Sequence, residues 1–199
     1  MMKFATQLDA NREEITVLYP QVNWKDQLLD QLEFYWDYYF TRHLPGLTDE
    51  EFFWEPVANC WTVHPNGDGT FRADLQVSPE PDPAPFTTIA WRMTHLMQVF
   101  GERASRQFGD GTFDRNTMYV PGTANQALAE LTRQHDLWFD GLRGLNPDDL
   151  ARPTGPTEGP YQNDPLAALI LHITREVIHH ASEVCVLRDL YRNRATLRK

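Results

Sequence analysis

Apolar side chains recur every three to four residues in four long segments, which is the pattern of helices with one buried face. The segments cover residues 24–44, 86–108, 123–143 and 165–192. Asn23 precedes the first and Thr87 or Thr88 opens the second, and residues of these types cap helix N-termini. The Pro45-Gly46 pair ends the first helix. The pattern therefore predicts an all-α fold, a four-helix bundle.

Residues 56–85, between the first and second helices, lack this spacing. Two short runs, 60–64 and 70–75, flank the turn sequence PNGDG at 65–69, which predicts a β-hairpin. A proline-rich, extended stretch follows at 79–85. Irregular segments of this length inside a compact domain are often functional. We therefore expect one bundle domain over residues 1–199, with 56–85 inserted as a lid or loop.

The last segment places a carboxylate and an imidazole on its apolar side. At about 100° per residue, one stripe of the helix contains Ile173, Val177, Val184, Leu187 and Tyr191. His180 falls within the stripe and Glu176 beside it, one turn earlier. Burying either group without a partner costs several kcal/mol. A divalent metal would compensate for both, and their i, i+4 spacing suits two ligands of one ion.

A metal site needs further ligands, and the other histidines are the candidates. His95 lies in a helix that is apolar around most of its circumference. A lone buried histidine is usually satisfied by a backbone carbonyl, but a facing Glu176 and His180 favour His95 as the third ligand. His172 lies one turn before Glu176, where it is either a hydrogen-bond donor to that carboxylate or a polar residue at the helix end.

His179 points about 100° away from His180, toward the surface. Glu183, one turn beyond His179, is most simply a solvated residue of the same face. His43 and His135 occupy positions of the kind that ordinary exposed residues have.

Composition and charge exclude several classes of protein. The formal net charge of the 199 residues is −10, and basic residues are enriched only in the short C-terminal tail, which disfavours nucleic acid and acidic membranes as partners. No apolar run is long enough to cross a bilayer, and no apolar signal region follows the first residues, so we expect a cytoplasmic protein. The 2 cysteines form no disulfide framework or CxxC site. The aromatic run at 34–40 is typical of residues that pack in a core. Any part of it that is exposed would indicate a homodimer surface.

With these residues identified, the chain resembles the DinB-like superfamily, which includes the mycothiol-dependent maleylpyruvate isomerase group and the bacillithiol S-transferases. The similarity covers most of the chain from the first helix onward. It is strongest in TTIAWRMTH at 87–95 and in REVIHHASE at 175–183, followed by LRDLY at 187–191. Relatives bind a divalent metal, often zinc or nickel, through a histidine of the second bundle helix and a pair of residues on the last. In the isomerase branch that pair is Glu and His, so the resemblance implies His95, Glu176 and His180 as ligands.

Three protein ligands leave one coordination position open, as in catalytic zinc sites. The resemblance therefore implies a thiol-dependent S-transferase or isomerase that acts on a small electrophile through a metal-bound thiolate, with mycothiol as a candidate thiol. The alternatives are a hydrolase that uses metal-bound water and a non-catalytic bundle that binds a metal or another ligand. No catalytic residue is assigned beyond the metal ligands. Trp61 and His64 on the lid, and His172, are expected to contact the substrate.

Overall fold

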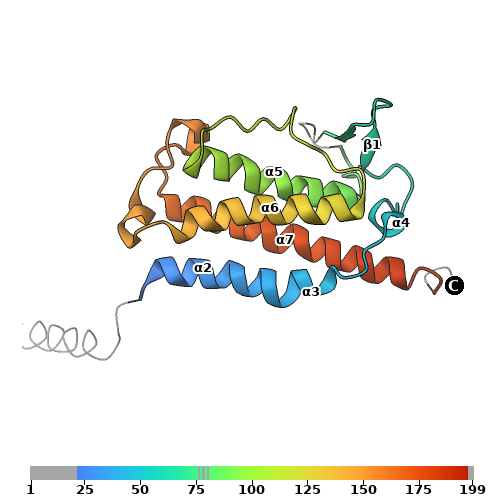
Figure 1. The fold of residues 1–199 in the computed structure, drawn as a ribbon, viewed down its shortest axis with the longest axis horizontal. Coiled ribbons are helices and arrows are strands. Elements are labelled where there is room, and N and C mark those ends of the chain that lie inside the picture. Colours follow the sequence, from blue (N-terminus) through green and yellow to red (C-terminus); the bar gives the residue numbers. More distant parts are fainter. Residues whose placement is uncertain (1–21, 76, 78, 80, 197–199) are drawn as a thin grey trace, which may run out of the picture.

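The computed structural model describes residues 22–75, 77, 79 and 81–196, and its main body is a bundle of four long helical segments (Figure 1). The first is α2 (Trp24–Phe34), continued by η1 (Tyr35–Phe40) and α3 (Thr41–His43). The others are α5 (Ile89–Phe108), α6 (Ala124–Arg143) and α7 (Leu166–Arg192). The predicted all-α bundle is thus confirmed. Among the described residues, no helix has the length and apolar character that a membrane span requires.

The helices do not simply alternate in direction along the chain. In Figure 1, α2 and α7 run one way and α5 and α6 run the other. The segment that connects α5 to α6, residues 109–123, runs back along the outside of the bundle. Short elements fill the remaining connections: α4 (Asp49–Phe52), η2 (Pro147–Ala151) and η3 (Pro156–Tyr161). α5 packs against both α6 and α7. Residues of α5 and α7 can therefore face each other across one interhelical seam.

Local side-chain chemistry sets the helix starts close to where the sequence predicts them. The Asn23 side chain accepts a hydrogen bond from the Asp26 backbone N–H, and the Thr88 hydroxyl accepts one from Trp91. The expected continuous helix at 24–44 differs in one respect, because residues 35–40 form a π-helical turn. This turn buries Trp36 and Phe40, while Tyr38 and Tyr39 stay about half exposed. A homodimer surface at these tyrosines remains a prediction.

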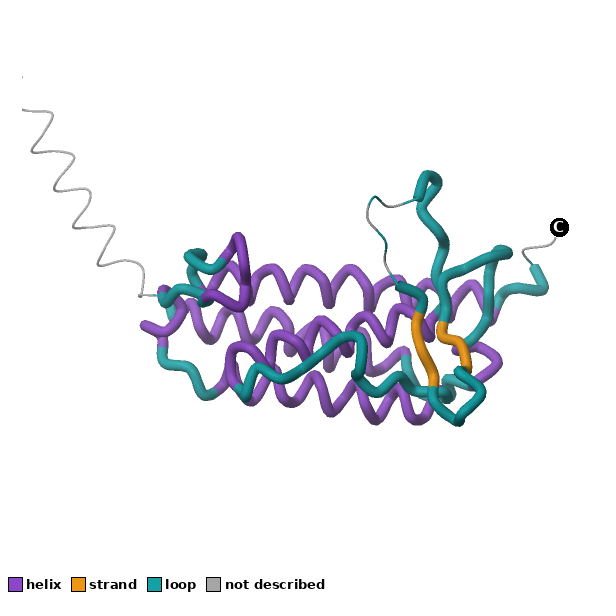
Figure 2. The backbone as a smooth tube through the Cα atoms, turned by 90° about the horizontal axis from the view of Figure 1, so that it is seen from above, coloured by secondary structure: helices purple, strands orange, loops and turns teal. Residues whose placement is uncertain are grey.

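The inserted segment contains the predicted hairpin. β1 (Val63–Pro65) pairs antiparallel with β2 (Phe71–Ala73), and both strands are shorter than the runs that predicted them. Figure 2 shows the hairpin beside one end of the bundle. Trp61 fixes it there, because its backbone N–H donates to Phe86 O and its carbonyl accepts from Thr88 N. The hairpin is therefore anchored where α5 begins, two turns before His95.

The core includes polar residues as well as apolar ones. Arg188 is fully buried, and its Nε lies 2.7 Å from Glu51 Oε1. His135, which the sequence pattern places at an ordinary exposed position, is 7% exposed. Its ring stacks between Trp36, at a centroid distance of 4.0 Å, and Phe139, at 4.2 Å. The α6 helix therefore buries a broader face than its aliphatic residues alone indicate.

Candidate metal centre

The seam between α5 and α7 brings together the three residues that the sequence singles out. His95 lies in the second turn of α5, and Glu176 and His180 lie one turn apart on α7. One ligand atom from each of the three lies within 4.8 Å of the others. The His95 and His180 rings meet edge to face at a centroid distance of 4.6 Å. Two nitrogens and one carboxylate oxygen thus converge from three side chains on two adjacent helices.

The two nitrogens of the His180 ring face different carboxylates. Nδ1 lies 2.7 Å from Glu183 Oε2, and Nε2 lies 3.4 Å from Glu176 Oε2. At 2.7 Å two lone pairs would repel, so Nδ1 carries the ring proton and donates it to Glu183. Nε2 then presents its lone pair toward a Glu176 oxygen. His180 is only 8% exposed, so little water is available to separate the two atoms. A cation between these two atoms would turn their repulsion into attraction, so the donor set fits a divalent metal.

Glu183 therefore supports the site, although the sequence pattern suggests a solvated face residue. It is half-buried, and Arg92 of α5 lies beside it, with Nε 2.9 Å from Glu183 Oε2. Arg92 Nη1 also lies 3.1 Å from His180 Nδ1, but with a proton on Nδ1 this contact is not a hydrogen bond. A carboxylate that accepts the second N–H of a metal-binding histidine fixes both the tautomer and the ring orientation. The i, i+3 spacing from His180 is the sequence signal that could have found it.

A second group of candidate ligands overlaps the first. His179, His180 and Glu183 also offer atoms within 4.8 Å of one another. In this group, however, Arg92 already compensates the carboxylate charge, and Glu183 lies against His180 Nδ1, to which the short distance assigns the ring proton. The His179 side chain is 65% exposed, as its position on the helix predicts. The first group is therefore the better metal site.

Burial sets the protonation states that metal binding needs. It lowers the pKa of His95 to about 3, with further contributions from His180 in its protonated form and from the charges of Arg92 and Arg115, while a hydrogen bond with Gln98 acts in the opposite direction. His95 is therefore a neutral imidazole, which is the ligating form. Burial alone would raise the pKa of Glu183, but the His180 hydrogen bond and the Arg92 charge outweigh it and lower that pKa. Glu183 is therefore ionised.

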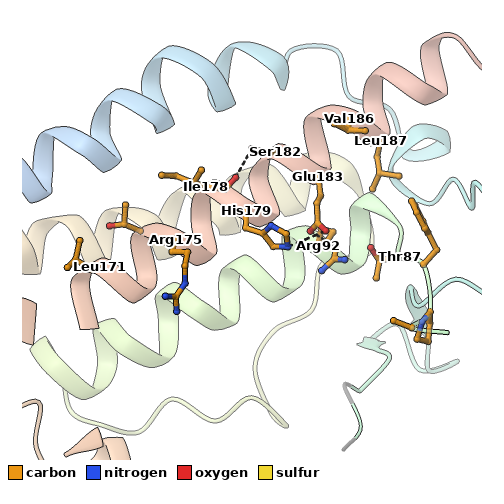
Figure 3. Close-up of a pocket in the computed structure, with 14 residues that line it drawn as sticks. Thr87, Arg92, Leu171, Arg175, Ile178, His179, Ser182, Glu183, Val186 and Leu187 are labelled. Carbon is orange, nitrogen blue, oxygen red and sulfur yellow. Dashed lines mark hydrogen bonds and ion pairs between the residues drawn. The ribbon is translucent and has the colours of Figure 1, made fainter. Parts of the chain in front are cut away.

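Two cavities flank the seam. A groove of about 910 Å³ follows the outer face of α7, where Figure 3 shows His179, Glu183 and Arg92 gathered at its centre. A smaller cavity of about 200 Å³ has His95 in its wall. Its lining comes from the hairpin end, α5 and the 109–123 connection, namely Ala73, Asp74, Leu75, Trp91, Thr94, His95, Gln98, Arg115 and Asn116. Of these two cavities, the smaller one has a residue of the His95, Glu176 and His180 group in its wall.

The three residues expected to contact substrate lie around the site at different distances. The Trp61 ring is 5.6 Å from that of Trp91, which stacks on His95 at 5.3 Å. Trp61 is thus separated from His95 by one aromatic ring. His64 Nε2 lies 2.9 Å from Asp74 Oδ2, which keeps it on the hairpin.

His172 Nδ1 lies 3.9 Å from Glu176 Oε1 and 2.6 Å from Arg175 Nη2. It is thus placed beside the Glu176 carboxylate, at the edge of the site. Asp74 and Leu75, which the sequence pattern did not single out, line the small cavity instead of Trp61 and His64. Substrate contact by Trp61, His64 and His172 stays a prediction.

Comparison with known proteins gave one finding. Residues 31–184 match the model of a protein family described as the DinB superfamily. This match covers α5, most of α7 and all three candidate ligands. Searches of curated proteins and of solved structures returned no match.

Proposed function

The chain belongs to the DinB superfamily, and we propose that it is a divalent-metal-dependent enzyme that joins a low-molecular-weight thiol to a small electrophile, as an S-transferase or isomerase. The single observation that carries the proposal is the convergence of His95, Glu176 and His180, with His180 Nε2 3.4 Å from a Glu176 oxygen. Two nitrogens and one oxygen suit zinc, with nickel as the alternative. Mycothiol is a candidate thiol. In this proposal the substrate is a small molecule, and neither a nucleic acid nor a membrane is a partner of the protein.

Each residue of the seam has a distinct role in this proposal. His95 and His180 would donate nitrogen lone pairs and Glu176 a carboxylate oxygen. A divalent ion held by them would supply Lewis acidity, which stabilises the anionic form of a thiol near neutral pH. Glu183 holds the proton on His180 Nδ1, and Arg92 keeps Glu183 ionised. The stacked Trp91 covers His95 on the hairpin side and restricts water there.

The test combines metal analysis with turnover. Purified protein should contain about one divalent ion per chain, and it should consume an electrophile only when a thiol such as mycothiol is present. Glu176→Ala and chelator-treated protein should lose both properties, and His179→Ala, one residue from the ligand, should keep both. Equal rates in wild type and Glu176→Ala across several thiols would favour a non-catalytic metal-binding bundle. Turnover that needs the metal but no thiol would favour a hydrolase.

A further inference from the structure

The small cavity beside His95 has an unusual wall for its size. Leu75 and the Trp91 ring form apolar surface, while Gln98, Asn116 and Arg115 supply amide and guanidinium groups. Its volume of about 200 Å³ is below the usual range of about 300–1,000 Å³ for sites that bind drug-sized ligands. The occupant must therefore be a molecule of a few heavy atoms that has both apolar and polar parts.

Arg115 belongs to a buried ionic cluster in which cations outnumber anions. Glu102 contacts Arg106, with Oε1 2.6 Å from Nη2, and Arg115, with Oε2 2.9 Å from Nε. Glu158 Oε2 lies 2.7 Å from Arg103 Nη1. Three guanidinium groups thus share two carboxylates, and the cluster carries one surplus positive charge.

The surplus charge is presented to the cavity and not to the core. The Arg115 side chain is 46% exposed, whereas those of Arg106 and Arg103 are 28% and 17% exposed. Among these three arginines, only Arg115 lines the cavity. The one carboxylate in the wall, Asp74, is already engaged, because it accepts from Thr62 N at 2.8 Å and contacts His64 Nε2. Arg115 Nε and Nη2 both contact Glu102, so an anion that enters the cavity would meet the guanidinium through Nη1, which takes no part in these contacts.

We propose that this cavity is a carboxylate-binding subsite, in which Arg115 anchors a short-chain carboxylate beside His95 and the Gln98 and Asn116 amides supply further polar contacts. A planar guanidinium matches a carboxylate in geometry and charge. The subsite holds one end of a small reactant while its other end reaches the seam. Its meaning for catalysis rests on the proposed function, but the binding itself needs no metal. The carboxylate can belong to the electrophile or to the thiol.

The binding test uses metal-free protein, so that it does not depend on the proposed function. Succinate binding to His180→Ala, kept in chelator at low ionic strength, is measured by calorimetry, with succinamide as the uncharged probe. We expect succinate to bind and succinamide to bind at least about tenfold more weakly, since the charge-assisted contacts are lost. Arg115→Gln in the same background should weaken succinate binding by about tenfold or more. Arg115→Lys should restore part of it, because the charge returns without the planar fork.

A matched control comes from Arg133, another arginine paired with a glutamate, whose Nη2 lies 2.7 Å from Glu130 Oε1 on the exposed face of α6. Arg133→Gln should leave succinate binding unchanged. Circular dichroism of Arg115→Gln shows whether the variant is folded. If it is not, Arg115→Lys replaces it, and this variant should bind succinate more weakly than its parent. The proposal is overturned if succinate does not bind, if succinamide binds equally well, or if Arg115→Gln binds succinate as its parent does.

Turnover measurements then identify which reactant carries the carboxylate. With metal-loaded protein, mercaptoacetate is compared with mercaptoethanol as the thiol, and acrylate with acrylamide as the electrophile, through the KM value for each compound. If the thiol occupies the subsite, Arg115→Gln raises the mercaptoacetate KM about tenfold. If the electrophile occupies it, the same change raises the acrylate KM instead. An Arg115→Gln variant that changes neither KM relative to the neutral analogue contradicts a role of the subsite in the reaction.

Discussion

Two polar clusters include residues of the same helix, α7, and they achieve charge balance in different ways. At the C-terminal end, Arg188 pairs with Glu51 at 2.7 Å, and its guanidinium also donates to the His43 carbonyl. Three turns earlier, Glu176 faces the Nε2 of His180 at 3.4 Å, and His95 closes the group from α5. The first cluster contains a permanently charged cation. The second contains imidazoles, which are cationic only when a proton is added.

This difference distinguishes a cluster that stabilises the fold from a cluster that is suited to bind a metal ion. Glu51 is compensated at every ordinary pH, because an arginine in a protein does not lose its proton. Burial disfavours the charged form of His95 and brings its pKa to about 3, so a proton on His95 is a poor source of positive charge in the seam. A divalent ion would bind neutral imidazoles directly and supply the missing charge. Stability should therefore depend on the first cluster, and ligand binding on the second.

The largest effect on stability should come from Arg188→Met. Removing the guanidinium leaves the Glu51 carboxylate buried without its partner, which costs about 3–5 kcal/mol of unfolding free energy. Urea denaturation measures the loss. The double variant Arg188→Met with Glu51→Leu should recover most of it, since neither charge remains buried. A single variant as stable as wild type would contradict a structural role for the pair.

The second effect concerns metal content and should leave the fold in place. His180→Ala removes the ligand that both candidate groups share, so bound metal should fall from about one ion per chain to none, while helicity by circular dichroism stays near that of wild type. His179→Ala, the adjacent and exposed histidine, should keep its metal. If metal were lost from His179→Ala and retained in His180→Ala, the ligand set would be wrong.

A smaller effect should follow from Glu183→Gln. The amide can still accept the His180 Nδ1 proton, but it lacks the charge that makes this hydrogen bond strong and the ring nitrogen basic. Metal affinity, measured by competition with a chromogenic chelator, should fall about 10- to 100-fold. Saturating metal should restore one ion per chain. A loss of stoichiometry that excess metal cannot restore would make Glu183 a direct ligand.

The smallest effect is the pH dependence contributed by His135, which belongs to neither cluster. Burial lowers the pKa of His135, and the nearby Asp136 and Asp37 only partly offset this. The unfolded chain therefore takes up a proton more readily than the native protein. This contribution to stability is complete above the ordinary histidine pKa of 6.5 and is lost as the pH falls below it. In metal-free protein, urea midpoints between pH 8 and pH 5 should show a smaller decrease for His135→Phe than for wild type.

Helical periodicity indicated the positions of Glu176 and His180 on one side of their helix, because the direction of a side chain on a helix follows from its residue number. His95 was a candidate because its own helix is apolar around most of its circumference and because Glu176 and His180 were expected to face it. The sequence pattern also predicted the four long helices and, through the turn at 65–69, the hairpin. These features depend on interactions between residues close in the sequence. The bundle and the facing of α5 and α7 then follow from burying the apolar stripes.

Packing between distant segments decided the rest. Glu183 has the same spacing pattern as a surface residue, and only the approach of Arg92 from α5 makes it a partner of His180. His135 is buried because Trp36 of the π-helical turn lies over its ring. The cavity beside His95 exists because the hairpin end and the 109–123 connection meet at α5. The sequence by itself thus determines which face of a helix each residue occupies, whereas burial, pKa and cavity shape depend on the segment that covers that face.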